Sequence, residues 1–185
     1  MKNTLPVLKT LAVALPFGLT AFLCVFGSLT LQTPGTEMIL DPREIFVVLG
    51  AALTGPLGAL LIGTLAGIYD PVPDVYPVTI AMHVAGALWM AFAYKKLVFE
   101  NITSWLLFPA WSGLVAVYYF VILLPVMVFG SSLSPELFAH LFPDNTPPQA
   151  LLAFYGLAWP EFILTSVTTT AILALLPKRL RKPRW

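Results

Sequence analysis

Long apolar runs separated by short polar segments constrain this sequence more than any other feature. The runs cover residues 5–31, 45–69, 78–94, 105–129 and 149–176. A transmembrane helix needs about 20 predominantly apolar residues, which most of these runs supply. Only 10% of the 185 residues are charged, against roughly 25% in ordinary globular domains. The sequence therefore predicts an all-α integral membrane protein, with one transmembrane domain over residues 1–185.

The first apolar run resembles a secretory signal because Lys2 and Lys9 precede it. Its apolar stretch extends from about residue 11 to residue 31, which is longer than the roughly 7–15 residues of a signal peptide. We therefore expect a retained transmembrane helix.

The second apolar run, Ile45–Tyr69, is interrupted by Thr54-Gly55-Pro56 and has two interpretations. It is either a single helix kinked at Pro56 or a pair of short helices joined by a turn at Gly55-Pro56. Each short helix would have only about 11–15 residues, too few to cross a hydrocarbon core of about 30 Å alone. Neighbouring helices make such short spans tolerable.

The distribution of basic residues favours the two-helix interpretation. With the N-terminus in the cytoplasm, two crossings in Ile45–Tyr69 place nine of the ten basic residues inside, Arg43 being the exception. A single crossing would put Lys95 and Lys96 opposite one of the basic termini. The positive-inside rule thus predicts a six-helix bundle with short second and third helices and both termini cytoplasmic, in a bacterial or archaeal cell membrane. Four full crossings plus a re-entrant pair would give the same sidedness.

Small residues recur at every fourth position of the second run: Ala51, Gly55, Ala59, Gly63 and Gly67. Such a stripe lets a neighbouring helix approach closely, either within the chain or in a partner subunit. The first helix carries a shorter version, Ala14 and Gly18, which we expect to dock onto a partner.

The stretch from Asp41 through Gly55-Pro56-Leu57-Gly58 to Gly67 resembles the substrate-binding S components of energy-coupling factor vitamin transporters. It also resembles the five-transmembrane sensor domain found ahead of some bacterial histidine kinases and cyclases. The first resemblance implies a vitamin-like substrate and a transmembrane coupling subunit with ATPases. The second implies ligand sensing through a partner signalling protein.

Polar and aromatic residues in or beside the runs are the candidate substrate-binding residues: Glu37, Arg43, Glu44, His83, Tyr118, Tyr155, Trp159 and Glu161. Glu161 is an intramembrane carboxylate, which is costly and marks either a ligand site or a structural pair. His83 is either a hydrogen bond between helices or a ligand. The aromatic residues belong either to the interfacial belt or to a stacking pocket for a flat ligand.

Composition restricts the classes of function. The net charge of +1 gives no reason to expect nucleic acid as a partner, and one cysteine, Cys24, cannot build a disulfide or a zinc cluster. There is no phosphate-binding Gly-x-x-x-x-Gly-Lys-Ser/Thr loop, paired catalytic carboxylates or His-x-x-x-His motif. We expect no catalytic residue, metal or cofactor. The sequence predicts uptake of a small organic micronutrient, with lipids and ATPase-bearing subunits as partners, and ligand sensing as the alternative.

Overall fold

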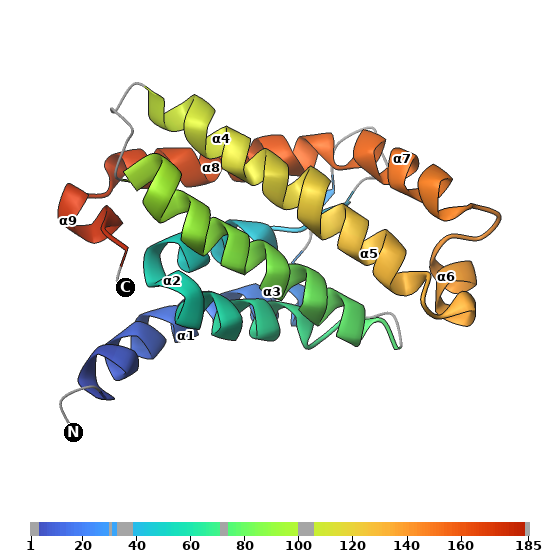
Figure 1. Ribbon diagram of the computed structural model, residues 1–185, viewed down its shortest axis with the longest axis horizontal. Coiled ribbons are helices and arrows are strands. Elements are labelled where there is room, and N and C mark those ends of the chain that lie inside the picture. Colours follow the sequence, from blue (N-terminus) through green and yellow to red (C-terminus); the bar gives the residue numbers. More distant parts are fainter. Residues whose placement is uncertain (1–3, 30, 33–38, 71–73, 100–105, 184–185) are drawn as a thin grey trace.

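The computed structural model describes the chain except residues 1–3, 30, 33–38, 71–73, 100–105 and 184–185. Its elements are the helices α1 (Thr4–Phe26), α2 (Arg43–Gly67), α3 (Tyr76–Ala93), α4 (Leu107–Ala116), α5 (Leu124–Ser131), α6 (Pro135–Leu141), α7 (Pro147–Leu157), α8 (Trp159–Leu175) and α9 (Lys178–Arg181), the π-helices η1 (Tyr94–Phe99) and η3 (Val117–Leu123), and the strands β1 (Leu31–Gln32) and β2 (Ile39–Leu40). The two short strands pair antiparallel, with Leu31 opposite Leu40. The described chain is therefore helical apart from this small hairpin (Figure 1).

Helix α2 reverses direction at Gly55. That glycine has φ 77° and ψ −170°, a conformation almost confined to glycine, and Pro56 follows it. Arg43 Nη1 donates a hydrogen bond of 3.0 Å to the carbonyl oxygen of Ala66, 23 residues away. A continuous helix would separate these residues by about 35 Å. The turn predicted at Gly55-Pro56 is therefore confirmed, and α2 is a hairpin of two short arms.

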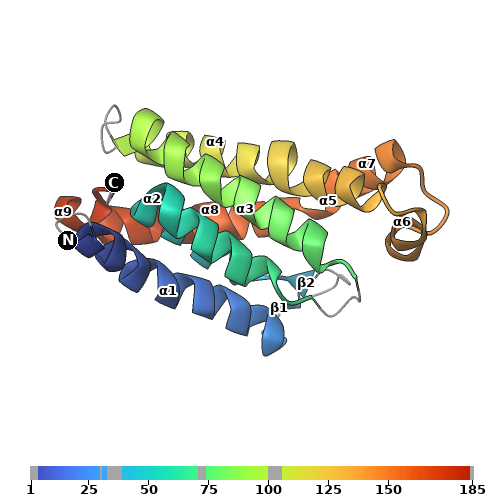
Figure 2. The ribbon, with the colours of Figure 1, turned by 60° about the horizontal axis from the view of Figure 1, so that its bottom comes forward.

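The α2 hairpin lies between α1 and α3, and glycines let the backbones meet (Figure 2). A Cβ added to Gly63 would lie 2.7 Å from the backbone nitrogen of Val84, and one added to Gly67 would lie 2.5 Å from that of Ile80. The second half of the predicted small-residue stripe is therefore an intramolecular contact with α3. A hydrogen bond supports this contact: the hydroxyl of Thr79 in α3 donates to the carbonyl oxygen of Gly67 at 2.7 Å.

The last predicted span, residues 149–176, is not a single helix. Helices α7 and α8 meet at Ala158 with a bend of 49°. Pro160 stands in the first turn of α8, where its missing N–H and its ring disfavour a continuous helix through this point. The short helix α6 precedes α7, and at its start the Ser134 side chain accepts a hydrogen bond from the backbone N–H of Leu137.

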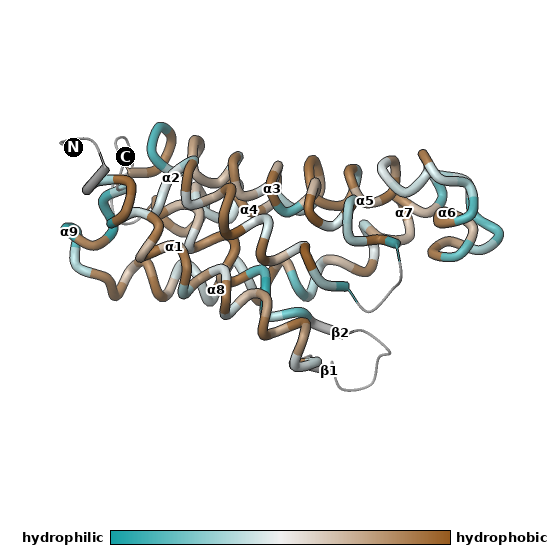
Figure 3. The backbone as a smooth tube through the Cα atoms, turned by 90° about the horizontal axis from the view of Figure 1, so that it is seen from below, coloured by the Kyte–Doolittle hydropathy of each residue, from teal (hydrophilic) through white to brown (hydrophobic). Residues whose placement is uncertain are grey.

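By length and composition, the described residues contain four helices able to cross a membrane, or five if the bent α7–α8 pair counts as one span. The four are Pro6–Phe26, Arg43–Gly67, Tyr76–Phe99 and Leu107–Ser131. The prediction of a multi-pass helical membrane protein is therefore confirmed, with four to five candidate spans when the two arms of α2 are counted as one. The count of six helices stays a prediction. Figure 3 places hydrophobic residues along the long helices and many of the hydrophilic ones near the two ends of the molecule.

Candidate functional site

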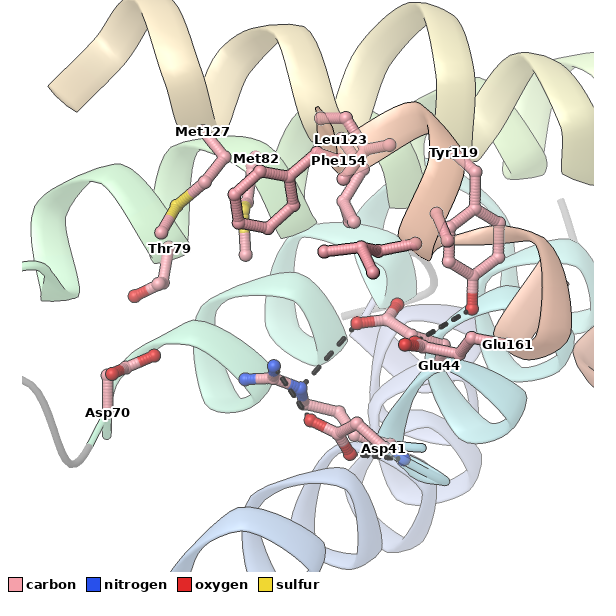
Figure 4. Close-up of a pocket in the computed structure, with 14 residues that line it drawn as sticks. Asp41, Glu44, Asp70, Thr79, Met82, Tyr119, Leu123, Met127, Phe154 and Glu161 are labelled. Atoms are coloured by element: carbon pink, nitrogen blue, oxygen red, sulfur yellow. Dashed lines mark hydrogen bonds and ion pairs between the residues drawn. The ribbon is translucent and has the colours of Figure 1, made fainter. Parts of the chain in front are cut away.

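A cavity of about 1000 Å³ opens between the start of α2 and helices α3, α5, α7 and α8. Figure 4 shows the carboxylates of Asp41, Glu44 and Glu161 on one side of it, and Met82, Leu123 and Phe154 facing them. A largely apolar cavity with a few convergent polar groups is the usual form of a small-molecule site.

Arg43 is buried at the base of this cavity and is engaged by neighbours from its own segment. Its Nη2 lies 2.8 Å from Asp41 Oδ2, and its backbone N–H donates to Asp41 Oδ1 at 2.8 Å. Its Nε lies 3.6 Å from Glu44 Oε1, within ion-pair range but with no hydrogen bond. Burial raises the pKa of the Asp41 carboxyl above its usual range, and the adjacent guanidinium partly offsets this effect. The cavity lining therefore includes a buried guanidinium that pairs with Asp41 and lies close to Glu44.

Glu44 connects the hairpin to two other elements. It is 1% exposed, and its Oε1 lies 2.9 Å from His83 Nε2 of α3. Its Oε2 accepts a hydrogen bond from the hydroxyl of Tyr118 in η3. His83 Nδ1 in turn lies 2.6 Å from the carbonyl oxygen of Thr79. The carboxylate of Glu44 therefore links α2 to α3 and to η3 at the edge of the cavity.

Glu161 lines the cavity from the first turn of α8. The Tyr119 hydroxyl donates to its Oε1 at 3.1 Å and lies 3.0 Å from the Thr165 hydroxyl. The π-helical geometry of η3 accompanies two adjacent tyrosines that both point inward, Tyr118 to Glu44 and Tyr119 to Glu161. Such π-helical turns are often found at functional sites.

The comparison with protein families supports one of the two resemblances. Residues 1–134 match the model of the five-transmembrane family described as 5TMR of 5TMR-LYT. The chain belongs to this family. No curated protein and no solved structure matches this 5TMR chain. The match supports the five-transmembrane sensor domain and gives no support to the S components of vitamin transporters.

Three of the residues predicted for the site line the cavity of this 5TMR chain: Arg43, Glu44 and Glu161. His83 and Tyr118 do not line it and instead bind Glu44 from behind. Glu37 lies outside the described residues.

Two predicted aromatic residues lie away from the cavity lining. The Tyr155 hydroxyl donates to the carbonyl oxygen of Phe120 at 2.6 Å. Trp159 is 53% exposed and packs against the Phe120 ring at a centroid distance of 4.9 Å. Both residues therefore pack against the Phe120 ring, next to residues that line the cavity but not among them.

The predicted docking pair, Ala14 and Gly18, faces inward. Ala14 is fully buried, and a Cβ added to Gly18 would lie 2.7 Å from the Leu65 side chain of α2. The open side of α1 carries other, exposed residues: Leu8, Leu15, Leu19 and Leu23. Ala14 and Gly18 thus contribute to packing within the chain, and the surface that α1 offers to lipid or to a partner is leucine-rich.

The sequence did not single out several residues that line the cavity: Thr79, Met82, Tyr119, Leu123, Leu124, Met127, Phe154 and Leu157. Only Tyr119 carried a signal, as the neighbour of Tyr118. The others are apolar or hydroxyl residues at positions typical of any packed transmembrane helix.

Proposed function

We propose that this chain is a ligand-sensing membrane module, which binds a small molecule in its cavity and acts through a partner signalling protein. The observation that carries the proposal is the cavity of about 1000 Å³, with mixed apolar and carboxylate walls, in a member of a five-transmembrane family. The proposal assigns recognition to Arg43, Glu44 and Glu161 and no catalysis to the chain.

Helix α3 provides a physical route from the cavity to the opposite end of the molecule. Thr79 and Met82 of α3 line the cavity. The same helix continues into η1, where the Tyr94 hydroxyl donates to the backbone carbonyl of Arg181 in α9 at 3.0 Å. A shift of α3 on ligand binding would therefore act directly on the last described helix.

A screen of small metabolites for thermal stabilisation of the purified chain tests this proposal, because a ligand that binds only the folded state must raise the melting temperature. The Ala158→Phe variant places a phenyl ring in the cavity lining, beside Glu161, and is expected to abolish the stabilisation. The matched control is Ala153→Phe, at an exposed position of α7. Stabilisation that survives Ala158→Phe would place the ligand elsewhere, and a screen without any stabilising compound would remove the sensing proposal.

The identity of the protein that copurifies with this chain distinguishes sensing from the uptake function that the sequence predicts. A kinase or cyclase that copurifies with the chain, and whose activity changes with the ligand, is the expected result. Copurification of ATPase subunits, together with accumulation of the ligand in cells that contain the chain, would favour uptake instead.

We also propose that both termini are cytoplasmic in a cell membrane, with four full crossings and α2 as a re-entrant hairpin. Each arm of α2 has about 12 residues and a length of about 18 Å, too short to span alone. The start of α1 and the end of α8 lie at the same end of the molecule (Figure 2). Cysteines introduced at Lys96 and Lys182, in a Cys24→Ala background, should react from the cytoplasmic side, and one at Asp144 from the opposite side. Labelling of positions 96 and 182 from different sides would contradict this topology.

A further inference from the structure

The polar groups around Arg43 and Glu44 form a group without net charge. Arg43 pairs with Asp41 at 2.8 Å. His83 Nδ1 faces a carbonyl oxygen, which only accepts, so this nitrogen carries a hydrogen. The 2.9 Å contact between His83 Nε2 and Glu44 then holds one further proton. Whether that proton resides on the imidazole or on the carboxyl, the His83–Glu44 pair is neutral in sum.

Glu161 is not part of this balance. It accepts a hydrogen bond from the neutral hydroxyl of Tyr119, and among the described residues no basic side chain lies within ion-pair distance of its carboxylate. A charged carboxylate at membrane depth costs about 2.5–3.5 kcal/mol on insertion scales. A ligand that carries one positive charge would supply the missing counter-charge.

Arg43 does not offer an equivalent site for an anion. Its guanidinium already contacts Asp41, the carbonyl oxygen of Ala66 and the neighbourhood of Glu44. An anionic ligand would have to displace these contacts and would meet Glu161 as a like charge. Asp70 is a further carboxylate in the lining of the cavity, so the charges of the described lining residues favour a cation over an anion.

The remaining walls of the cavity indicate the polarity of the uncharged part of the ligand. They are apolar side chains from α3, η3, α5 and α7: Met82, Leu123, Leu124, Met127, Phe154 and Leu157. Methionine and aromatic walls accommodate an apolar body and adapt to its shape. The Tyr119 and Phe154 rings also provide faces that attract an ammonium group.

We propose, resting on the sensing function above, that the cavity binds an organic monocation whose ammonium group pairs with Glu161 and whose apolar body fills the space lined by α3, α5 and α7. A small inorganic ion would leave these apolar walls uncovered. The proposal thus names both the charge and the polarity of the ligand.

Matched probes of different charge test the ligand class. The purified full chain is titrated with 2-phenylethylammonium, 2-phenylethanol and 3-phenylpropanoate, and then with adamantane bearing an ammonium, hydroxyl or carboxylate group, at constant ionic strength. We expect at least one cation to bind at least about 10-fold more tightly than its alcohol, since a charged partner adds to the hydrogen bond, and its carboxylate to bind most weakly. Calorimetric affinity and melting temperature are the measurements.

The Glu161→Gln variant keeps the shape of the side chain and removes its charge. It is expected to bring the cation and the alcohol within about twofold of each other in affinity, while the affinity for the alcohol changes little. Glu136→Gln makes the same chemical change at an exposed position of α6, outside the cavity, and should leave the discrimination intact.

Two outcomes overturn this inference. One is that no cation binds more tightly than its neutral counterpart, and the other is that the preference for cations persists in Glu161→Gln. Neither outcome affects the sensing proposal, which depends on stabilisation by some metabolite in the wider screen and on its loss in Ala158→Phe.

Discussion

Replacement of Glu44 by alanine is expected to lower the free energy of unfolding by about 3–5 kcal/mol, the effect of breaking a buried ion pair from one side. The variant leaves His83 Nε2 and the Tyr118 hydroxyl without their shared acceptor and removes a charge next to Arg43. Water cannot easily reach the two partners left behind, because His83 and Tyr118 are both fully buried. The loss therefore includes the full cost of unpaired buried polar groups.

Reversible unfolding in mixed micelles of SDS and a mild detergent measures this effect. Glu44→Gln keeps the size of the side chain and an acceptor oxygen, so we expect a smaller loss than for alanine. Glu136→Ala is the matched control, since Glu136 is exposed and its removal should change stability by no more than about 0.5 kcal/mol. A Glu44→Ala variant as stable as the control would show that the link between α2, α3 and η3 does not hold the fold together.

The reversal of α2 was accessible from the sequence because two independent signals agree. Gly55-Pro56 supplies a backbone that cannot continue a helix, and the position of Lys95 and Lys96 requires that Ile45–Tyr69 begin and end on the same side. The bend at Ala158 was not predicted, although Pro160 marks it. A proline within a long apolar run is compatible with a kinked single span or with two helices, and residues 149–176 contain no basic residue that would decide.

Only part of the site could be predicted, through some of its charged residues. Asp41 and Asp70 also line the cavity and were not among the predicted site residues. Arg43, Glu44 and Glu161 stand out because charge is rare in this chain, and all three line the cavity. The sequence did not reveal that His83 and Tyr118 turn toward Glu44, because helix rotation and pairing are decided by packing between elements far apart in the chain. The same holds for Tyr119, whose inward direction accompanies the π-helical geometry of η3.

The function was harder to derive than the fold. The region from Asp41 to Gly67 resembles two families of helical membrane domains, and the residues alone favoured uptake, with sensing as the alternative. The match over residues 1–134 moves the balance to the sensor domain. The residues that shape the ligand on the α7–α8 side, including Phe154 and Glu161, lie outside that match. The family match therefore does not bear on the ligand proposed for this chain.

Substitution of Gly67 by alanine is expected to lower the free energy of unfolding by about 1–3 kcal/mol, the usual range for inserting an atom into a packed contact. The new methyl group would lie 2.5 Å from the backbone nitrogen and Cα of Ile80, and a backbone cannot move aside as a side chain can. Helices α2 and α3 would have to separate, which would also stretch the 2.7 Å hydrogen bond from Thr79 to the carbonyl oxygen of Gly67.

Gly113→Ala provides a control with the same chemical change and the opposite expected sign. A Cβ at Gly113, in α4, meets nothing within 4 Å, so the methyl group costs no packing and reduces the freedom of the unfolded chain. Its free energy of unfolding should be unchanged or higher by up to about 1 kcal/mol in the same micelle titration. Because Thr79 and Met82 of α3 line the cavity, Gly67→Ala should also weaken ligand binding, whereas Gly113→Ala should not. Equal effects of the two substitutions would mean that close contact between α2 and α3 does not hold the cavity wall in place.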